Sequence, residues 1–228
     1  YRECDLWVPR KNGKTGLAAG LALYLMLADR EPAAEVYGAA NDREQAKLVF
    51  KDAKEMVSRS ELVDEINIFK SSMVHPDTLS SYQALSSEAA NKDGLNPSGL
   101  VWDEFHEAKS QDLYDKLTTG SDARRQPLFL FLSTAGSNRM GMAYRRFKAA
   151  RDVLTRKRKN PEWLVIICQA GEKDDWKKES TWKKANPGWG VSVKPDKVRA
   201  AFRKTLVDPV EEAAFRRKDG ERHRVSHY

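Results

Sequence analysis

Cysteine is scarce in this 228-residue sequence, which contains only Cys4 and Cys168. The two cysteines lie far apart and form no metal-ligand spacing, so a reducing, cytosolic setting is the simpler expectation. The sequence also lacks a run of 18 apolar residues and a signal-peptide pattern, which argues against membrane insertion and against secretion. No internal repeat and no low-complexity tract is visible, so a repeat architecture is not expected.

Charge, in contrast, is plentiful, and its balance is basic. Charged residues make up 32% of the sequence and hydrophobic residues 40%, which is enough for a real core. The formal net charge of +7 and the pI of about 9.3 are compatible with a polyanionic partner such as nucleic acid, although they do not require one. The length suits one medium domain, or one domain with a small appendage. Because the sequence begins at Tyr1 without a methionine, we expect a fragment or a processed form.

Residues 8–15 resemble the phosphate-binding P-loop G-x-x-x-x-G-K-[ST], with Val8 in place of the first glycine. Gly13 allows the backbone to approach phosphate oxygens closely, and Lys14 can reach the β- and γ-phosphates of a nucleotide. The hydroxyl of Thr15 can bind Mg²⁺, and the positive end of a following helix attracts the anion. The motif therefore predicts a nucleotide site, against the alternative of a chance match in a basic loop.

Strand-like and helix-like runs alternate along the chain, which favours an α/β fold with a mostly parallel sheet flanked by helices. Strands are expected near residues 6–8, 35–40, 66–70, 78–85, 100–102, 127–132 and 163–168. Helices are expected near residues 16–28, 43–58, 139–159, 194–205 and 209–218. From Gly171 onward, tryptophans stand among charged residues, Pro and Gly, so we predict a core domain over 1–169 and a small subdomain over 170–228.

Polar residues follow two of the expected strands. Asp103 and Glu104 end the apolar run 100–102, and a P-loop enzyme needs such a pair, one acid for Mg²⁺ and one to orient the attacking water. Taken alone, the pair would be an ordinary helix cap, but the upstream Gly-Lys-Thr favours the catalytic interpretation. Ser133 and Thr134 end the run 127–132 and can sense the γ-phosphate, or simply form a turn.

Several motifs occur in a specific order along the chain: V-P-R-K-N-G-K-T, A-A-N-D-R-E-Q-A, D-G-L-N-P-S-G-L-V-W-D-E-F-H-E, L-F-L-S-T-A-G and W-K-K-A-N-P-G. With the F-R-R segment at 215–217, this set resembles the large subunit of tailed-bacteriophage terminase, the ATP-driven motor that packages viral DNA. The resemblance extends from about residue 5 to about residue 218. It implies an additional-strand, RecA-like P-loop NTPase fold with a small lid subdomain.

The resemblance also implies roles for individual residues. Glu104, Lys14 and Arg10 would be catalytic, with Arg10 replacing what Val8 cannot offer, and Thr15 and Asp103 would bind the metal. The residues implied to contact the nucleotide are Arg10, Lys11, Asn12, Gly13, Lys14, Thr15, Ser133 and Thr134. Lys92 is a candidate for the residue donated in trans to a neighbouring subunit.

The cofactors that this family implies are ATP and Mg²⁺. Its implied partners are double-stranded DNA, a ring of identical subunits at a phage portal and the small terminase subunit, all in the cytoplasm of an infected bacterium. The family's adenine-recognition segment would lie upstream of Tyr1. The end of the sequence, 219–224, shows no acid cluster of the kind found in the family's nuclease domain, so DNA cleavage is not predicted for this polypeptide.

Residues 139–159 contain nine basic residues and one acid, Asp152. On a helix they would form a positive surface able to meet DNA phosphates without reading sequence. The candidate DNA contacts are Arg139, Arg145, Arg146 and Arg151. A solvated helix face, or a surface facing an acidic neighbouring subunit, is the alternative. The lysines beside Trp182 offer a second basic patch, although the tryptophans more simply pack the small subdomain.

Two other functions compete with the packaging motor. The run Asp103 to His106 fits the DExH box of helicases, but helicases need a second RecA-like domain, and about 60 residues after Cys168 are too few for one. The other candidate is a non-hydrolysing DNA-binding module whose P-loop is degenerate at Val8. The presence of Lys14 and Glu104 favours hydrolysis over this alternative. His106 could relay the nucleotide state, although a structural, hydrogen-bonded histidine is the simpler expectation.

Overall fold

The computed structural model describes residues 1–218 except 42, 86–93, 110, 137 and 172. The strands are β1 (Glu3–Trp7), β2 (Glu35–Ala39), β3 (Asn67–Ile68), β4 (Ser72–Val74), β5 (Ser81–Ala84), β6 (Gly99–Trp102), β7 (Leu128–Ser133) and β8 (Trp163–Ile167). The α-helices are α1 (Lys14–Leu27), α2 (Arg43–Ser58), α3 (Gln111–Thr119), α4 (Met142–Leu154), α5 (Glu179–Ala185), α6 (Pro195–Thr205) and α7 (Pro209–Lys218), and short 3-10 turns are η1 (Glu61–Asp64) and η3 (Phe105–Glu107).

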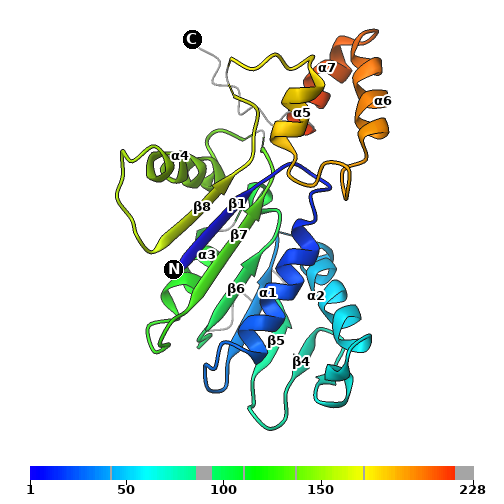
Figure 1. Cartoon of the computed structure of the whole chain (residues 1–228). Helices are drawn as coiled ribbons and strands as arrows, with labels where there is room; N and C mark the ends of the chain where they lie inside the picture. The colour runs from blue at the N-terminus through cyan, green and yellow to red at the C-terminus, as the bar shows by residue number, and fades with distance from the viewer. Residues whose placement is uncertain (42, 86–93, 110, 137, 172, 219–228) are drawn as a thin grey trace.

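Within the described residues the strands form one eight-stranded sheet in the order β3-β4-β5-β2-β6-β7-β1-β8. Each neighbouring pair from β5 through β2, β6, β7 and β1 to β8 is parallel. At the opposite side of the sheet, β3 pairs with β4 and β4 with β5 in antiparallel fashion. Strand β7 lies between β1 and β6, and this is the additional strand of the predicted RecA-like fold. The α/β prediction is therefore confirmed. As a result, the carboxyl ends of the parallel strands β1, β7 and β6 lie next to one another at the same end of the sheet (Figure 1).

The sheet has an apolar core on each face because its strands alternate between them. Val101, Leu130 and Leu132 face one side, where they pack with α1 and α2, which lie side by side in Figure 1. Trp102 and Phe131 face the other side and pack with α3 and α4. Alanines in α1 are fully buried, so this helix approaches the sheet closely, and its first turn reaches the strand ends.

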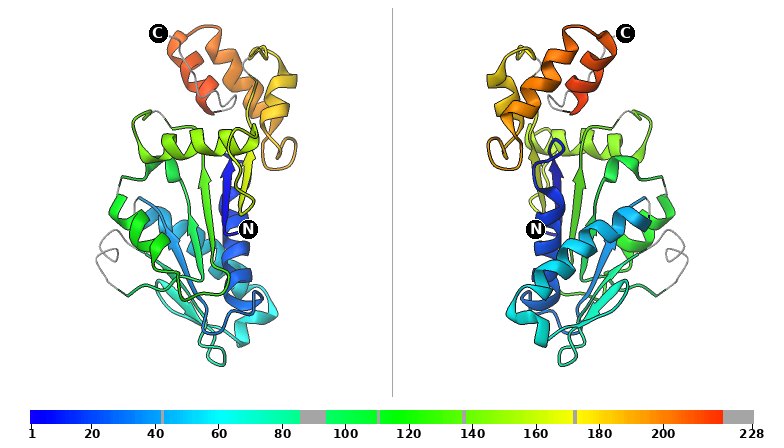
Figure 2. Two further views of the ribbon diagram at one scale, coloured as in Figure 1. Left: turned by 90° about the vertical axis from the view of Figure 1, so that its left-hand side faces the viewer. Right: turned by 90° about the vertical axis from the view of Figure 1, so that its right-hand side faces the viewer.

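Helices α5, α6 and α7, here called the α5–α7 group, stand beyond the ends of β1 and β8 with an apolar cluster of their own (Figure 2). The cluster consists of Trp176, Trp182, Trp189, Val193, Val198, Ala201, Phe202 and Phe215. The expectation that these tryptophans pack a local core is confirmed. In the described part of the chain, no helix is both long enough and apolar enough to cross a membrane.

Several element boundaries differ from the predictions. The basic helix expected over 139–159 is limited to α4, Met142–Leu154, because Gly141 begins it and Arg156 takes a positive φ of 59° just after it. The charged tail 156–159 is thus a loop. The sequence does not predict β4, α3 or α5, because they are too short for their periodicity to stand out.

Candidate nucleotide site

The loop between β1 and α1 wraps around the side chain of Lys14. Its Nζ donates to the carbonyl oxygens of Val8, at 3.0 Å, and Pro9, at 3.4 Å, and only 6% of the residue is exposed. Gly13 precedes the helix with a φ of 77°, a conformation that favours glycine, and Lys11 has a φ of 67°. The loop is therefore a tight ring around a buried ammonium group.

The first turn of α1 has the features of an anion-binding helix N-terminus. It contains no acidic residue, and no side chain caps it. The first N–H groups of an α-helix lack intrahelical partners and carry partial positive charge, so with Lys14 beside them they form a phosphate-binding geometry. Val8, in the position of the missing glycine, is 2% exposed, and its N–H donates to the carbonyl of Ser133 at 3.1 Å. Val8 thus fastens the start of the loop to the end of β7.

The carboxylate of Asp103 lies beside the hydroxyl of Thr15, with 3.5 Å between Thr15 Oγ1 and Asp103 Oδ2. This contact joins the first turn of α1 to the end of β6. Burial raises the pKa of Asp103, the charge of Glu104 raises it further, and Lys14 opposes both. A buried carboxylate next to a second one favours a bound cation, and Mg²⁺ uses one or two carboxylates, a hydroxyl and phosphate oxygens. Thr15 and Asp103 therefore fit a Mg²⁺ shared with a nucleotide.

Glu104 is held in a strained conformation at the end of β6. Its φ of 47° and ψ of 46° are left-handed, which costs a residue other than glycine about 1–2 kcal/mol. Its Oε2 lies 3.2 Å from His106 Nδ1 and accepts a long hydrogen bond of 3.5 Å from Thr134 Oγ1. A quarter of the side chain, 25%, is exposed, so water can reach the carboxylate. Backbone strain of this kind is typical of residues held for function.

His106 lies between two carboxylates. Its Nδ1 faces Glu104, and its Nε2 lies 3.2 Å from Glu107 Oε1. Burial lowers the pKa of His106, Arg10 and Lys14 lower it further, and the two glutamates act in the opposite direction. Burial therefore disfavours the charged imidazolium, whereas the two glutamate carboxylates favour it. The sequence predicts a hydrogen-bonded structural histidine or a relay of the nucleotide state, and the contact of His106 with Glu104 is compatible with both.

Ser133 and Thr134 have different surroundings. The Ser133 hydroxyl is buried, accepts the N–H of His106 at 3.1 Å and donates to the carbonyl of Thr134 at 3.0 Å. Because its one O–H donor is used within the protein, we assign Ser133 to holding β7 against η3 rather than to nucleotide contact. Thr134 lies against Glu104 and remains a candidate for a contact to the γ-phosphate.

Asn12 points from the loop toward the α5–α7 group. Its Nδ2 donates to Asn186 Oδ1 at 2.8 Å, and its Oδ1 accepts the N–H of Gly188 at 2.8 Å. The sequence shows Asn186-Pro187-Gly188 only as part of a motif, and no local pattern indicates that this turn meets the P-loop. Arg10 and Lys11 are exposed and, with Lys194 just before α6 and Lys197 of α6, line a hollow of about 130 Å³ beside this junction.

Arg146 corrects one of the predicted DNA contacts. Its side chain is 8% exposed, and the guanidinium group donates to both oxygens of the fully buried Asp5, at 2.6–3.0 Å. The same group lies 3.9 Å from the ring centre of Phe131 and 4.7 Å from that of Trp163. Arg146 is therefore committed to an internal ion pair, and we remove it from the proposed DNA surface.

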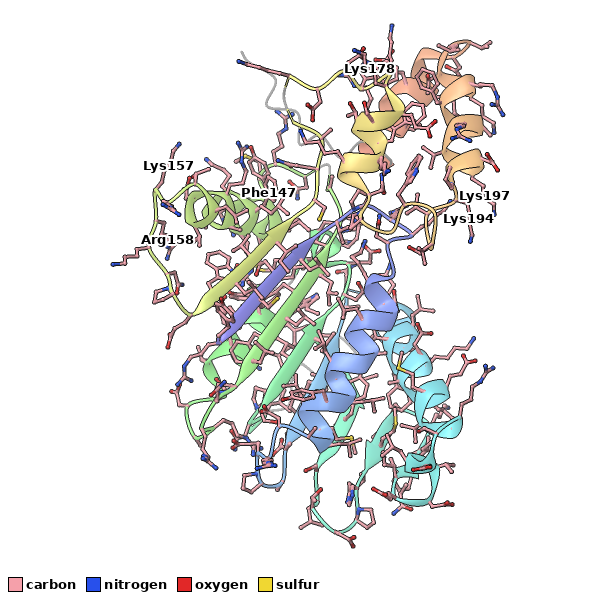
Figure 3. All side chains as sticks on the ribbon, viewed as in Figure 1. Phe147, Lys157, Arg158, Lys178, Lys194 and Lys197 are labelled. Atoms are coloured by element: carbon pink, nitrogen blue, oxygen red, sulfur yellow. The ribbon has the colours of Figure 1, made fainter. Side chains whose placement is uncertain are left out.

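The other predicted basic residues lie on the surface or outside the described residues. Arg139 and Arg145 are exposed near the start of α4, and Arg151 is partly exposed near its end. Figure 3 shows Lys157 and Arg158 pointing outward from the loop after α4, whereas Phe147 points toward the sheet. Lys92, the candidate for action in trans, lies outside the described residues.

The additional-strand sheet, the P-loop around Lys14 and the acids at the end of β6 define a P-loop nucleotide-binding protein of the RecA-like class. Residues 1–152 match the family described as "Terminase large subunit, ATPase domain", and the chain belongs to this family. Because the match includes residues 103–106, the helicase interpretation is set aside.

Individual relatives agree with this assignment. The chain is similar to the terminase large subunit of Enterobacteria phage HK97, with 30% identity over 192 residues, covering 82% of this chain and 37% of that protein. A crystal structure of the HK97 large terminase superposes with a TM-score of 0.84 at 28% identity, covering 95% of this chain and 46% of that one. Protein YmfN of Escherichia coli K12 is 41% identical over 101 residues, covering 44% of this chain and 22% of that protein. The chain thus spans less than half the length of these relatives.

Proposed function

We propose that this chain hydrolyses ATP to drive double-stranded DNA into a viral procapsid, as the motor domain of a terminase large subunit. The observation that carries the proposal is the convergence of four groups at one edge of the sheet. Lys14 and Thr15 begin α1, and Asp103 and Glu104 end β6, with the Thr15 hydroxyl and the Asp103 carboxylate 3.5 Å apart. These are the groups that phosphoryl transfer to water requires.

The geometry supports a different role for each of these residues in binding and hydrolysing ATP. Lys14 would leave the carbonyls of Val8 and Pro9 and bind the β- and γ-phosphates, with Arg10 approaching from the exposed side of the loop. Glu104 would orient the attacking water, and its contacts with Thr134 and His106 hold its carboxylate in place. Mg²⁺, held by Thr15 and Asp103, would supply positive charge to the phosphate oxygens.

We propose that residues 170–228 form a lid subdomain on a 1–169 core, and that the motor is a ring of subunits. The ring would dock on a phage portal with the small terminase subunit, in the cytoplasm of an infected bacterium. Lys92 as a residue acting in trans stays a prediction of the sequence.

DNA contact is proposed for Arg139, Arg145 and Arg151 together with the charged loop 156–159. Arg145 and Arg158 border an open hollow of about 380 Å³ on this side of α4, so phosphates can approach both. Contacts of this kind depend on charge and weaken steeply with salt, without base specificity.

The test is phosphate release from ATP, measured with Mg²⁺ and with EDTA. Glu104→Gln keeps the size of the side chain and removes its negative charge, and we expect kcat to fall about 10²–10⁴-fold. Asp112→Asn, which removes an exposed carboxylate from α3, is the matched control and should match wild type. Equal phosphate release by Glu104→Gln and wild type would refute the assigned role, and ATP binding without hydrolysis by wild type would favour a non-hydrolysing module.

A further inference from the structure

Asn12 is placed to connect the P-loop with the α5–α7 group. Its carboxamide is used at both ends, because Nδ2 donates to Asn186 Oδ1 and Oδ1 accepts the N–H of Gly188, each at 2.8 Å. A side chain with both ends engaged in this way is not free to serve as a nucleotide ligand. We infer that Asn12 is a positioning residue that transmits phosphate occupancy of the P-loop to the α5–α7 group. The inference rests on the proposed ATP site.

The link from phosphate to Asn12 runs through one carbonyl group. The oxygen of Pro9 accepts a hydrogen bond from Asn12 Nδ2 at 3.0 Å and from Lys14 Nζ at 3.4 Å. A phosphate that attracts Lys14 removes one of these two donors, so the balance of bonds around Asn12 changes. The Asn12 carboxamide then meets Asn186 and Gly188 in a different geometry. The ammonium group that binds phosphate and the carboxamide that holds the α5–α7 group thus share an acceptor.

On the α5–α7 side of the contact, Asn186 is held in place by burial and by a hydrogen bond. Asn186 is 1% exposed, and its Nδ2 donates to the carbonyl of Trp182 at 2.8 Å, so it is anchored to the end of α5. Trp182 belongs to the apolar cluster of the α5–α7 group, so movement of this turn would carry the group with it. A Cβ atom on Gly188 would lie 2.2 Å from Ser192 Oγ and 3.1 Å from Asn12 Oδ1, which explains the glycine. The A-N-P-G motif therefore has a physical role that the nucleotide site alone does not give it.

The N–H of Gly188 provides a direct readout, because its acceptor is Asn12 itself. Amide hydrogen exchange would be measured residue by residue with no nucleotide, with Mg·ADP and with Mg·ATPγS. In wild type we expect nucleotide to change the exchange rate of the Gly188 amide at least threefold. The Val193 amide, which donates to the Gly188 carbonyl at 2.9 Å within the same turn, is the internal control and should change less.

Three variants separate signalling from simple structure. Asn12→Ala and Asn186→Ala should each abolish the nucleotide response at Gly188, and the double variant should add nothing further. Each should lower kcat several-fold while the Kd for ADP changes less than twofold. Asn67→Ala, which removes an exposed carboxamide from β3, is the matched control and should behave as wild type.

The results of these experiments separate the signalling role of Asn12 from the proposed ATP site. If the amides of Gly13 and Thr15 respond to nucleotide but Gly188 does not, the inference is wrong and the ATP site stands. If Asn12→Ala weakens ADP binding tenfold while Asn186→Ala does not, Asn12 is a nucleotide ligand and the inference is wrong. If no amide responds and no nucleotide binds, both proposals are wrong.

Discussion

Replacing Arg146 with alanine is expected to destabilise the fold and to leave DNA binding nearly intact. The guanidinium group is the counter-charge of Asp5, which is 0% exposed at the centre of β1. Removing one partner of a buried ion pair leaves the other charge uncompensated, which costs about 3–5 kcal/mol. The indole N–H groups of Trp7 and Trp163 still donate to the carboxylate, at 3.2 and 2.9 Å, so we expect a loss of about 3 kcal/mol.

The measurement is the free energy of unfolding from urea titrations followed by circular dichroism. For a chain of this size a loss of about 3 kcal/mol lowers Tm by about 6–12 °C. Arg145→Ala is the matched control, because it removes the same charge from the preceding residue of α4, which is exposed. Its stability should change by no more than about 0.5 kcal/mol.

DNA affinity at low salt should show the opposite order. Arg145→Ala is expected to weaken binding and to reduce the salt dependence, whereas Arg146→Ala is not. If Arg146→Ala kept wild-type stability and lost DNA binding, the assignment of Arg146 to the interior would be refuted.

Three further predictions concern single residues. Gly13→Ala meets no atom within 4 Å of the added Cβ but must hold a φ of 77°, so it should cost about 1–2 kcal/mol and weaken ADP binding in calorimetry. Burial raises the pKa of Cys4 to about 11, and the charge of Asp5 contributes to this shift. In a Cys168→Ser background, labelling of Cys4 by a thiol reagent at pH 8 should therefore be about 100-fold slower than labelling of free cysteine. The labelling rate should increase as the pH rises toward 11. Arg124→Ala removes donors to the carbonyls of Asn96 and Ala33 and to the Glu35 carboxylate, and urea titration should show a loss of about 2–3 kcal/mol; a loss below 0.5 kcal/mol would contradict the buried network.

Local patterns predicted the parts of the protein that depend on neighbours in sequence. Helix α2 spans Arg43–Ser58 as its apolar periodicity indicates, and the Gly-Lys-Thr run does begin a helix after a strand. Asp103 and Glu104 do end an apolar strand next to this loop. These features follow from periodicity and backbone geometry, which a single sequence records.

Contacts between distant segments could not be predicted in this way. The charge pattern of 139–159 indicates a basic surface, but nothing near Arg146 shows that it pairs with Asp5 of β1, which is distant in sequence. The junction of Asn12 with Gly188 and the left-handed backbone of Glu104 likewise arise only when separate elements meet. Sequence therefore indicated which groups carry the chemistry, whereas the fold determined which of them are available for it.

The proposed role of Glu104 in hydrolysis rather than in binding is tested by a single-turnover experiment in which the protein is in excess over Mg·ATP. This role predicts that Glu104→Gln binds ATP with the wild-type Kd and leaves it uncleaved, whereas wild type converts it to ADP. Equal conversion by both proteins, or loss of ATP binding in Glu104→Gln, would contradict it.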